Sequence, residues 1–146
     1  MKMKKNIIIA AIALATSCIS GYAQEKLSNG LELDKAVHNF GDVMLADGPV
    51  TCEFTLTNKG KSPAVIYNVT TTCGCTDVEW TREPIRPGAK GKISVTYSND
   101  EGPYPFDKSV TVYLSDMKKP IILKLRGVSM EEKKPLAELY PVSYGP

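Results

Sequence analysis

Histidine is almost absent from this chain, and several patterns that mark whole classes of enzyme are missing with it. His38 is the only histidine in 146 residues, which excludes a zinc site built from two cysteines and two histidines. The acidic residues are scattered through turns, without the spacing of a catalytic pair or a calcium loop. No glycine-rich loop is suited to a phosphate group. The sequence therefore predicts neither an enzyme nor a resident cofactor.

Long apolar runs are also missing. The run at residues 7–15 has nine members, far fewer than the ~20 that span a bilayer. Three lysines precede it and the small residues Gly21 and Ala23 follow it, which is the layout of a secretory signal peptide. We expect residues 1–23 to be a signal peptide cleaved after Ala23, with no transmembrane segment and a periplasmic or extracellular location.

Cys18 allows a second interpretation of this segment. Residues 15–18 (ATSC) loosely resemble a lipoprotein box, in which Cys18 would be lipidated. The protein would then be an outer-membrane lipoprotein. The match is imperfect, so cleavage after Ala23 is the preferred interpretation and a lipid anchor at Cys18 is the alternative.

Cleavage would reverse the sign of the net charge. The full chain has 18 Lys and Arg against 16 Asp and Glu, a formal charge of +2. Removing residues 1–23 takes away three lysines and no acidic residue, which leaves 123 residues with a charge of −1. Nucleic-acid binding needs a clustered basic face, so we expect no nucleic-acid partner. The remaining length suits one domain.

Apolar and polar residues alternate along most of the mature chain, and turn residues interrupt the alternation at short intervals. On one such segment Ile93, Val95 and Tyr97 share the inner face. The expected strands lie around residues 31–40, 50–57, 64–71, 75–80, 92–97, 109–114 and 121–126. This pattern predicts an all-β, immunoglobulin-like β-sandwich of about seven antiparallel strands within residues 24–128.

The C-terminal tail, residues 129–146, has a different composition. Charged residues and a proline at 131–135 are typical of a solvated linker. Residues 136–146 could be disordered, could cap the sandwich, or could pair with the sheet edge of another protein. The partner expected from this pattern is an unidentified envelope protein.

Three cysteines would remain after cleavage: Cys52, Cys73 and Cys75. In an oxidising compartment cysteines pair into disulfides, so an odd number leaves one thiol without a partner in the same chain. Cys52 lies on an apolar strand face and is expected in the core. Cys73 and Cys75 flank Gly74, which permits an unusual backbone, and they are weak candidates for binding Cu(I) or Zn(II) or for exchanging disulfides. The open alternatives are a bridge from Cys52 to Cys73 or Cys75, a Cys73–Cys75 bridge, an intermolecular bridge, and three thiolates on one metal ion.

The order of several short motifs carries a family resemblance. They are HNFGDV (38–43), FTLTNKG (54–60), TCGCT (72–76), PIRPG (84–88), ISVTY (93–97) and LRGV (125–128). In this order they resemble the bacterial exported domain-of-unknown-function family fifteen seventy-three, allied to the Hydin-type immunoglobulin-like domains, over roughly residues 31–128.

The resemblance implies a seven-stranded sandwich outside the cytoplasm and implies no activity. We therefore expect an exported cell-envelope protein that is a non-enzymatic protein-interaction or structural module. The alternative is a periplasmic thiol-redox or copper- or zinc-handling protein that uses Cys73 and Cys75.

Overall fold

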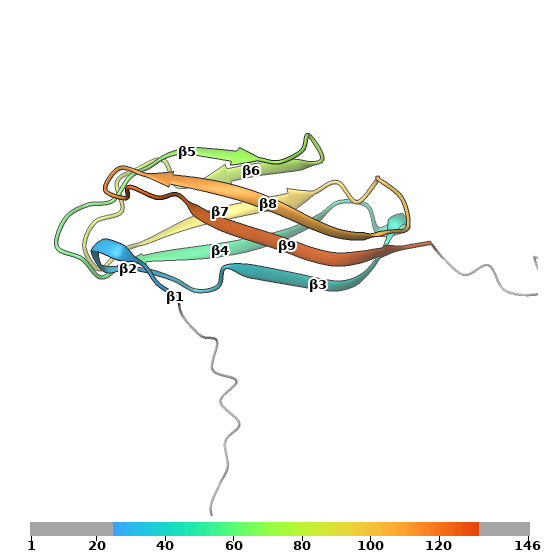
Figure 1. Ribbon diagram of the computed structural model, residues 1–146, viewed down its shortest axis with the longest axis horizontal. Helices are drawn as coiled ribbons and strands as arrows, with labels where there is room; N and C mark the ends of the chain where they lie inside the picture. The colour runs from blue at the N-terminus through green and yellow to red at the C-terminus, as the bar shows by residue number, and fades with distance from the viewer. Residues whose placement is uncertain (1–24, 132–146) are drawn as a thin grey trace, which may run out of the picture.

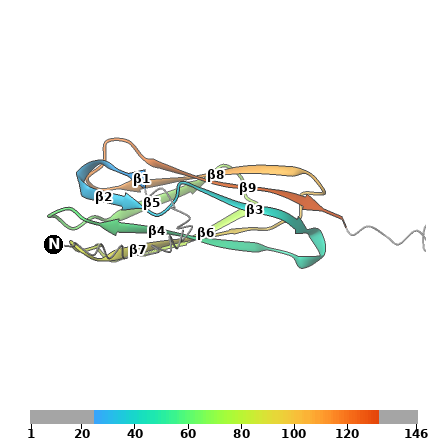
Figure 2. The same cartoon turned by 90° about the horizontal axis from the view of Figure 1, so that it is seen from below.

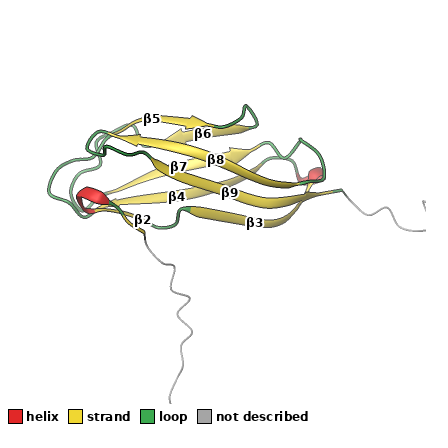
Figure 3. Ribbon diagram, viewed as in Figure 1, coloured by secondary structure: helices red, strands yellow, loops and turns green. Residues whose placement is uncertain are grey.

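The alternating segments become β-strands in the computed structural model, which describes residues 25–131 (Figure 1). The strands are β1 (Glu25–Lys26), β2 (Leu31–Leu33), β3 (Val37–Met44), β4 (Val50–Asn58), β5 (Ile66–Thr71), β6 (Thr76–Trp80), β7 (Lys90–Tyr97), β8 (Pro105–Leu114) and β9 (Ile121–Met130). Two short 3₁₀ turns, η1 (Ser28–Gly30) and η2 (Leu45–Asp47), lie in loops at the ends of the strands (Figure 3). The predicted signal peptide, and the part of the predicted tail beyond residue 131, lie outside the described residues.

The strands form two sheets, ordered β1-β2-β4-β7-β6 and β3-β9-β8-β5. Figure 2 shows the two sheets stacked, with β8 and β9 on the opposite side from β4 and β7. The predicted all-β sandwich is therefore confirmed. No helix within residues 25–131 is long and apolar enough to cross a membrane.

The core between the sheets is made by the apolar members of the alternating pattern. Phe54 on β4 lies opposite Ile93 on β7, and Val110 on β8 lies opposite Leu123 on β9. Burial of each such side chain contributes about 1.5–3 kcal/mol. The largest fully buried side chains are Leu31, Leu33, Phe54, Leu56, Ile93, Val95, Tyr97, Val110, Val112, Leu114, Leu123 and Leu125.

The expected opening strand, residues 31–40, is divided between the two sheets. Asp34 marks the division: its Oδ1 accepts hydrogen bonds from the backbone N–H groups of Lys35 and Thr55, at 2.9 and 2.8 Å. Its own N–H donates to the Thr55 carbonyl at 3.0 Å. Before Asp34 the chain pairs with β4, and after it β3 pairs with β9 in the other sheet. The β3–β9 pair is parallel, so the prediction of only antiparallel strands is wrong for this pair.

Candidate functional site

The Cys73-Gly74-Cys75 segment lies in a turn that links the two sheets. It follows β5, an edge strand of one sheet, and precedes β6, an edge strand of the other. The Thr71 hydroxyl donates to the Cys73 carbonyl at 3.0 Å, and the Ser98 N–H donates to the Cys75 carbonyl at 2.9 Å. These two contacts fix the turn against the end of β5 and against the residue that follows β7.

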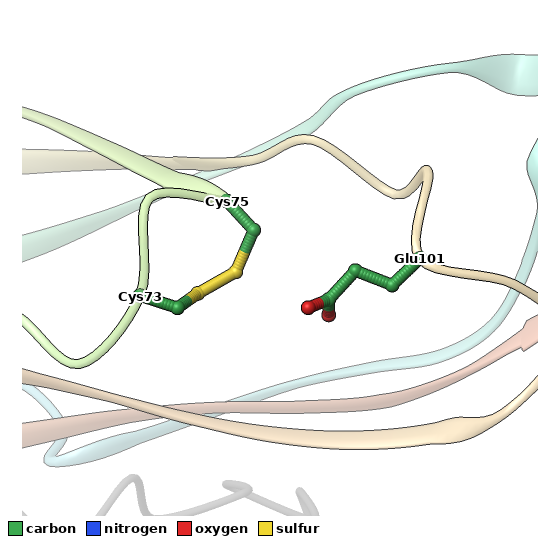
Figure 4. A group of neighbouring side chains, drawn as sticks. All are labelled: Cys73, Cys75 and Glu101. Atoms are coloured by element: carbon green, nitrogen blue, oxygen red, sulfur yellow. A yellow bond between two sulfur atoms is a disulfide. The ribbon is translucent and has the colours of Figure 1, made fainter.

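A disulfide joins Cys73 and Cys75, whose Cα atoms are 5.3 Å apart (Figure 4). Both residues are half-buried, and each sulfur lies 3.7 Å from the Oγ1 of Thr76. A Cβ at Gly74 would have no atom within 4 Å, and the φ angle of Gly74 is not in the left-handed region. Gly74 therefore does not adopt the unusual backbone that a glycine permits, and the bridge lies beside an open surface.

Glu101, in the β7–β8 loop, points its carboxylate at the disulfide (Figure 4). A carboxylate oxygen and the sulfurs of Cys73 and Cys75 all lie within 4.8 Å of one another. The Oε2 atom accepts a hydrogen bond from the Tyr97 hydroxyl at 3.0 Å and forms an ion pair with Lys108. Neither contact uses Oε1. The carboxylate is thus oriented from one side by Tyr97 and Lys108.

The same contacts keep Glu101 ionised. Hydrogen bonds from Lys108 and then from Tyr97 hold the pKa of Glu101 below its ordinary value. Burial, followed by the hydrogen bond to Glu101, raises the pKa of Tyr97. A neutral phenol, an ammonium group and a carboxylate therefore lie together next to the disulfide at neutral pH.

The β7–β8 loop is held in place by Asn99. This residue is 1% exposed and has a left-handed backbone, with φ 54°. Its amide donates to the carbonyls of Met44 and Gly48, at 2.8 and 3.1 Å. Because Glu101 follows two residues later, these bonds help to set the position of its carboxylate.

Cys52 is separate from this site. It lies on β4 opposite Val95, is 5% exposed and is a free thiol. Burial raises the pKa of the Cys52 thiol to about 11. Its position is in the core, as the alternation predicts, and the alternative of a bridge from Cys52 to Cys73 or Cys75 is not formed in the structure.

His38 is not near the cysteine turn either. It lies on β3, at the opposite edge of the four-stranded sheet from β5. With ~4.8 Å between neighbouring strands, the two edges are about 14 Å apart. His38 packs against Phe40 with ring centroids 4.4 Å apart, and burial, followed by the charge of Lys35, lowers its pKa. A Cys–His nucleophile pair is therefore not assembled by these residues.

One motif of the sequence is explained by the fold alone. Asn58, in the FTLTNKG segment, is 1% exposed, and its amide donates to the carbonyls of Ser62 and Ile85, both at 2.8 Å. Its Oδ1 accepts from the Gly60 N–H at 2.9 Å. These hydrogen bonds stabilise the loop at the end of β4, away from the cysteine turn.

The sequence did not indicate that Glu101, Tyr97 and Lys108 belong with the cysteines. Glu101 was one of several acidic residues in turns, and alternation placed Tyr97 in the core, where it is indeed buried. No feature of the sequence links Lys108 to the cysteines. The grouping depends on how the β7–β8 loop folds toward the β5–β6 turn, and no periodic pattern encodes that.

Several solved structures share the fold of the chain at low sequence identity. A protein of unknown function from Porphyromonas gingivalis W83 has a TM-score of 0.58 and 18% identity, over 70% of this chain and 49% of that one. The secreted serine protease VesC from Vibrio cholerae has a TM-score of 0.58 and 15% identity, over 77% of this chain and 25% of that one. WR4, an MSP family member from C. elegans, has a TM-score of 0.52 and 11% identity, over 68% of this chain and 99% of that one.

The chain thus spans about half or less of the first two of these proteins, and it spans nearly all of the third. No curated protein sequence matches it. A family model matches residues 31–129, from the start of β2 almost to the end of β9, and its description is "Protein of unknown function (DUF1573)". The chain belongs to the DUF1573 family.

Proposed function

We propose that this protein is an exported, non-enzymatic module of the cell envelope in which Cys73 and Cys75 act as a reversible dithiol–disulfide couple. The observation that carries the proposal is the bridge between these two residues, at a half-exposed turn. Cys52 also supports the proposal. This third thiol is buried in the core and does not pair with Cys73 or Cys75.

A structural role explains this bridge poorly. In the chain-entropy model, closing a loop of three residues stabilises a protein by about 1.6 kcal/mol, against about 3.4 kcal/mol for a loop of the length from Cys52 to Cys73. The Cys73–Cys75 bridge also ties together residues that the turn already holds close, through the bonds to Thr71 and Ser98. A bridge that adds little stability and is reachable from solvent is suited to repeated opening and closing.

The couple needs a dithiol reductant as its partner. A thiolate of the reductant attacks one sulfur of the bridge and releases the other as a thiolate, which takes up a proton. The second thiol of the reductant, as a thiolate, then attacks the reductant's own sulfur in the mixed disulfide and releases the remaining cysteine as a thiolate, which also takes up a proton. Two electrons and two protons pass to Cys73 and Cys75, and the reductant becomes a disulfide.

Differential alkylation tests this proposal, with Cys52 as an internal control. The native protein is treated with a mild dithiol, alkylated, then unfolded and alkylated with a second reagent for mass spectrometry. We expect the first label on Cys73 and Cys75 and the second label on Cys52, because the core protects Cys52. A bridge that opens only after unfolding would contradict the proposal.

Export is supported by the predicted leader. The expected cleavage after Ala23 would leave a mature chain that starts one residue before β1 (Glu25–Lys26), so every described strand of the sandwich would be retained. The mass of the protein recovered from the envelope fraction tests this. A start at Gln24 supports a soluble form, a lipidated start at Cys18 supports the anchored form, and an uncleaved chain would contradict export by a cleaved leader.

A second candidate function, capture of a partner protein by strand addition, is favoured by β3. This eight-residue strand pairs with β9 on one side and is an edge of its sheet on the other. An edge strand presents unpaired backbone groups to an extended peptide. The partner would be an envelope protein with such a peptide; the strand-donating role predicted for residues 136–146 lies outside the described residues.

Val37 offers a matched pair of variants for this second candidate. The Lys124 N–H donates to the Ala36 carbonyl, so in the parallel ladder the Val37 backbone faces the open side. Val37→Pro removes the outward N–H, whereas Val37→Ala keeps it. We expect Val37→Pro to lose partner proteins that the wild type and Val37→Ala both retain from an envelope extract. Identical partner sets for all three proteins would contradict docking at this edge.

A further inference from the structure

We infer that the dithiol form of Cys73 and Cys75, together with the carboxylate of Glu101, is a binding site for one zinc ion. The inference rests on the proposed reversibility of the disulfide and adds a ligand and a third coordinating residue to it. Its starting point is the grouping of two sulfurs and a carboxylate oxygen within 4.8 Å, from two loops that are distant in sequence.

The distances fit the coordination geometry of zinc. With Zn–S bonds of ~2.3 Å and Zn–O bonds of ~2.0–2.2 Å, tetrahedral ligand atoms lie about 3.5–3.8 Å apart. Opening the disulfide lets the sulfurs separate to this distance while the Cα atoms stay near their present 5.3 Å. The Glu101 carboxylate has to move by about 1 Å, which an exposed side chain can do by small rotations. A water molecule would complete the tetrahedron on the solvent side.

The carboxylate already has outer partners of the kind that metal ligands use. Ligating carboxylates are held by further hydrogen bonds that fix their orientation. Here the Tyr97 hydroxyl and Lys108 both contact Oε2, which leaves Oε1 to bind the metal. The Tyr97 side chain is itself fixed in the core, 1% exposed and stacked on Phe106 with centroids 4.4 Å apart.

The charges of the site balance with a divalent cation. Two thiolates and the Glu101 carboxylate carry −3, Lys108 contributes +1 and a zinc ion +2, which makes a neutral cluster. The charge balance therefore favours a divalent cation as the ligand of the dithiol form. Binding exchanges two thiol protons for one zinc ion, with no transfer of electrons.

The mixed donor set suits zinc. Cu(I) prefers sulfur ligands, whereas zinc accepts thiolate and carboxylate together. With two sulfurs and one carboxylate oxygen, the site has one hard ligand that Cu(I) would leave unused. Oxidation of the couple would remove both thiolates and release the zinc, so zinc occupancy would report the redox state of the protein.

The test uses the full exported protein, reduced with a phosphine and freed of reductant without oxygen. Free thiols are counted first, and zinc is then titrated against a chromogenic chelator, with native mass spectrometry for stoichiometry. We expect one zinc per reduced chain, none for the oxidised chain and none for Cys73→Ser. Glu101→Gln should weaken binding at least tenfold, while Glu83→Gln, which removes an exposed carboxylate elsewhere, should bind as the wild type does.

Cobalt(II) supplies a second measurement. In the wild type we expect a sulfur-to-cobalt charge-transfer band together with the visible bands of a tetrahedral ion, both changed in Glu101→Gln. If the thiol count shows that the bridge does not open, the proposed function fails together with the inference. If the thiols of Cys73 and Cys75 both appear but zinc does not bind, or binds equally well to Glu101→Gln, the zinc site alone is refuted.

Discussion

The hydroxyl of Ser129 donates a hydrogen bond to the Oδ1 atom of Asn99 at 2.6 Å, and both side chains are 1% exposed. The two residues come from the end of β9 and from the β7–β8 loop. Since the Asn99 amide also donates to Met44 and Gly48, one side chain joins three segments at this end of the sandwich. The hydrogen bonds of Asn99 therefore hold the loop that carries Glu101 in a fixed position against the sandwich.

Replacing Asn99 by alanine should destabilise the protein by about 3 kcal/mol. The change leaves two part-buried carbonyls and the buried Ser129 hydroxyl without their partner. Alanine also lacks the local side-chain hydrogen bonds that let asparagine tolerate a left-handed backbone, which costs about 1 kcal/mol. Urea denaturation measures the loss. Asn99→Gly is the matched control: it also loses the hydrogen bonds but tolerates the backbone, so it should be about 1 kcal/mol more stable than Asn99→Ala. A loss below about 1 kcal/mol in Asn99→Ala would mean that the loop is held by other contacts.

Substitution by alanine should destabilise the protein at one glycine, Gly60, and have little effect at another, Gly74. A Cβ at Gly60 would lie 2.5 Å from the backbone oxygen of Asn29, whereas a Cβ at Gly74 would have nothing within 4 Å. We expect Gly60→Ala to lose roughly 2 kcal/mol or more, because backbone must move, and Gly74→Ala to change stability by less than about 0.5 kcal/mol. Thermal unfolding of the two variants checks this, and equal effects would contradict the geometry of one of the turns.

Much of the fold could be predicted because alternation records which face of a strand each residue occupies. Cys52 and Tyr97 were both placed in the core by this rule, and both are buried. The division of the opening strand could not be predicted in this way. Leu31 and Leu33 of β2 are buried whereas Val37 of β3 is exposed, and the pattern carries no information about which strand is the neighbour or in which direction that strand runs.

The candidate site was predictable only in part, for a different physical reason. Cys73 and Cys75 stand out by residue type and spacing, whereas Glu101 resembles any acidic residue in a polar loop. Its position next to the sulfurs follows from the left-handed Asn99 and from the Lys108 ion pair across the loop. These are contacts between residues without a periodic relationship, so they become visible only in three dimensions.

Removing the disulfide should cost little stability. The variant with both Cys73→Ser and Cys75→Ser loses the constraint on a three-residue loop, which the chain-entropy model puts at about 1.6 kcal/mol. Urea denaturation of the oxidised wild type and of the double variant measures the difference. A loss of more than about 3 kcal/mol in the free energy of unfolding would show that the bridge stabilises the fold strongly, and it would weaken the proposal of a reversible couple.

The stability of the protein should fall on the alkaline side because of Cys52. Burial raises the pKa of this thiol from an ordinary value of 9.0 to about 11. Below pH 9 the thiol is protonated in both the folded and the unfolded chain, so it costs nothing. Between pH 9 and 11 the unfolded chain loses this proton and the folded chain keeps it, which favours unfolding by roughly 2–3 kcal/mol over the two pH units.

The variant Cys52→Ala isolates this contribution. It loses some packing at every pH, but it should lack the part of the alkaline decline that comes from the thiol. The raised pKa of Tyr97 acts in both proteins and cancels in the comparison. Urea denaturation at pH 8, 9, 10 and 11 under nitrogen should therefore show the two stability curves converging as the pH rises. Curves that stay parallel across this range would mean that the Cys52 thiol ionises at its ordinary pKa and that the core around it admits water.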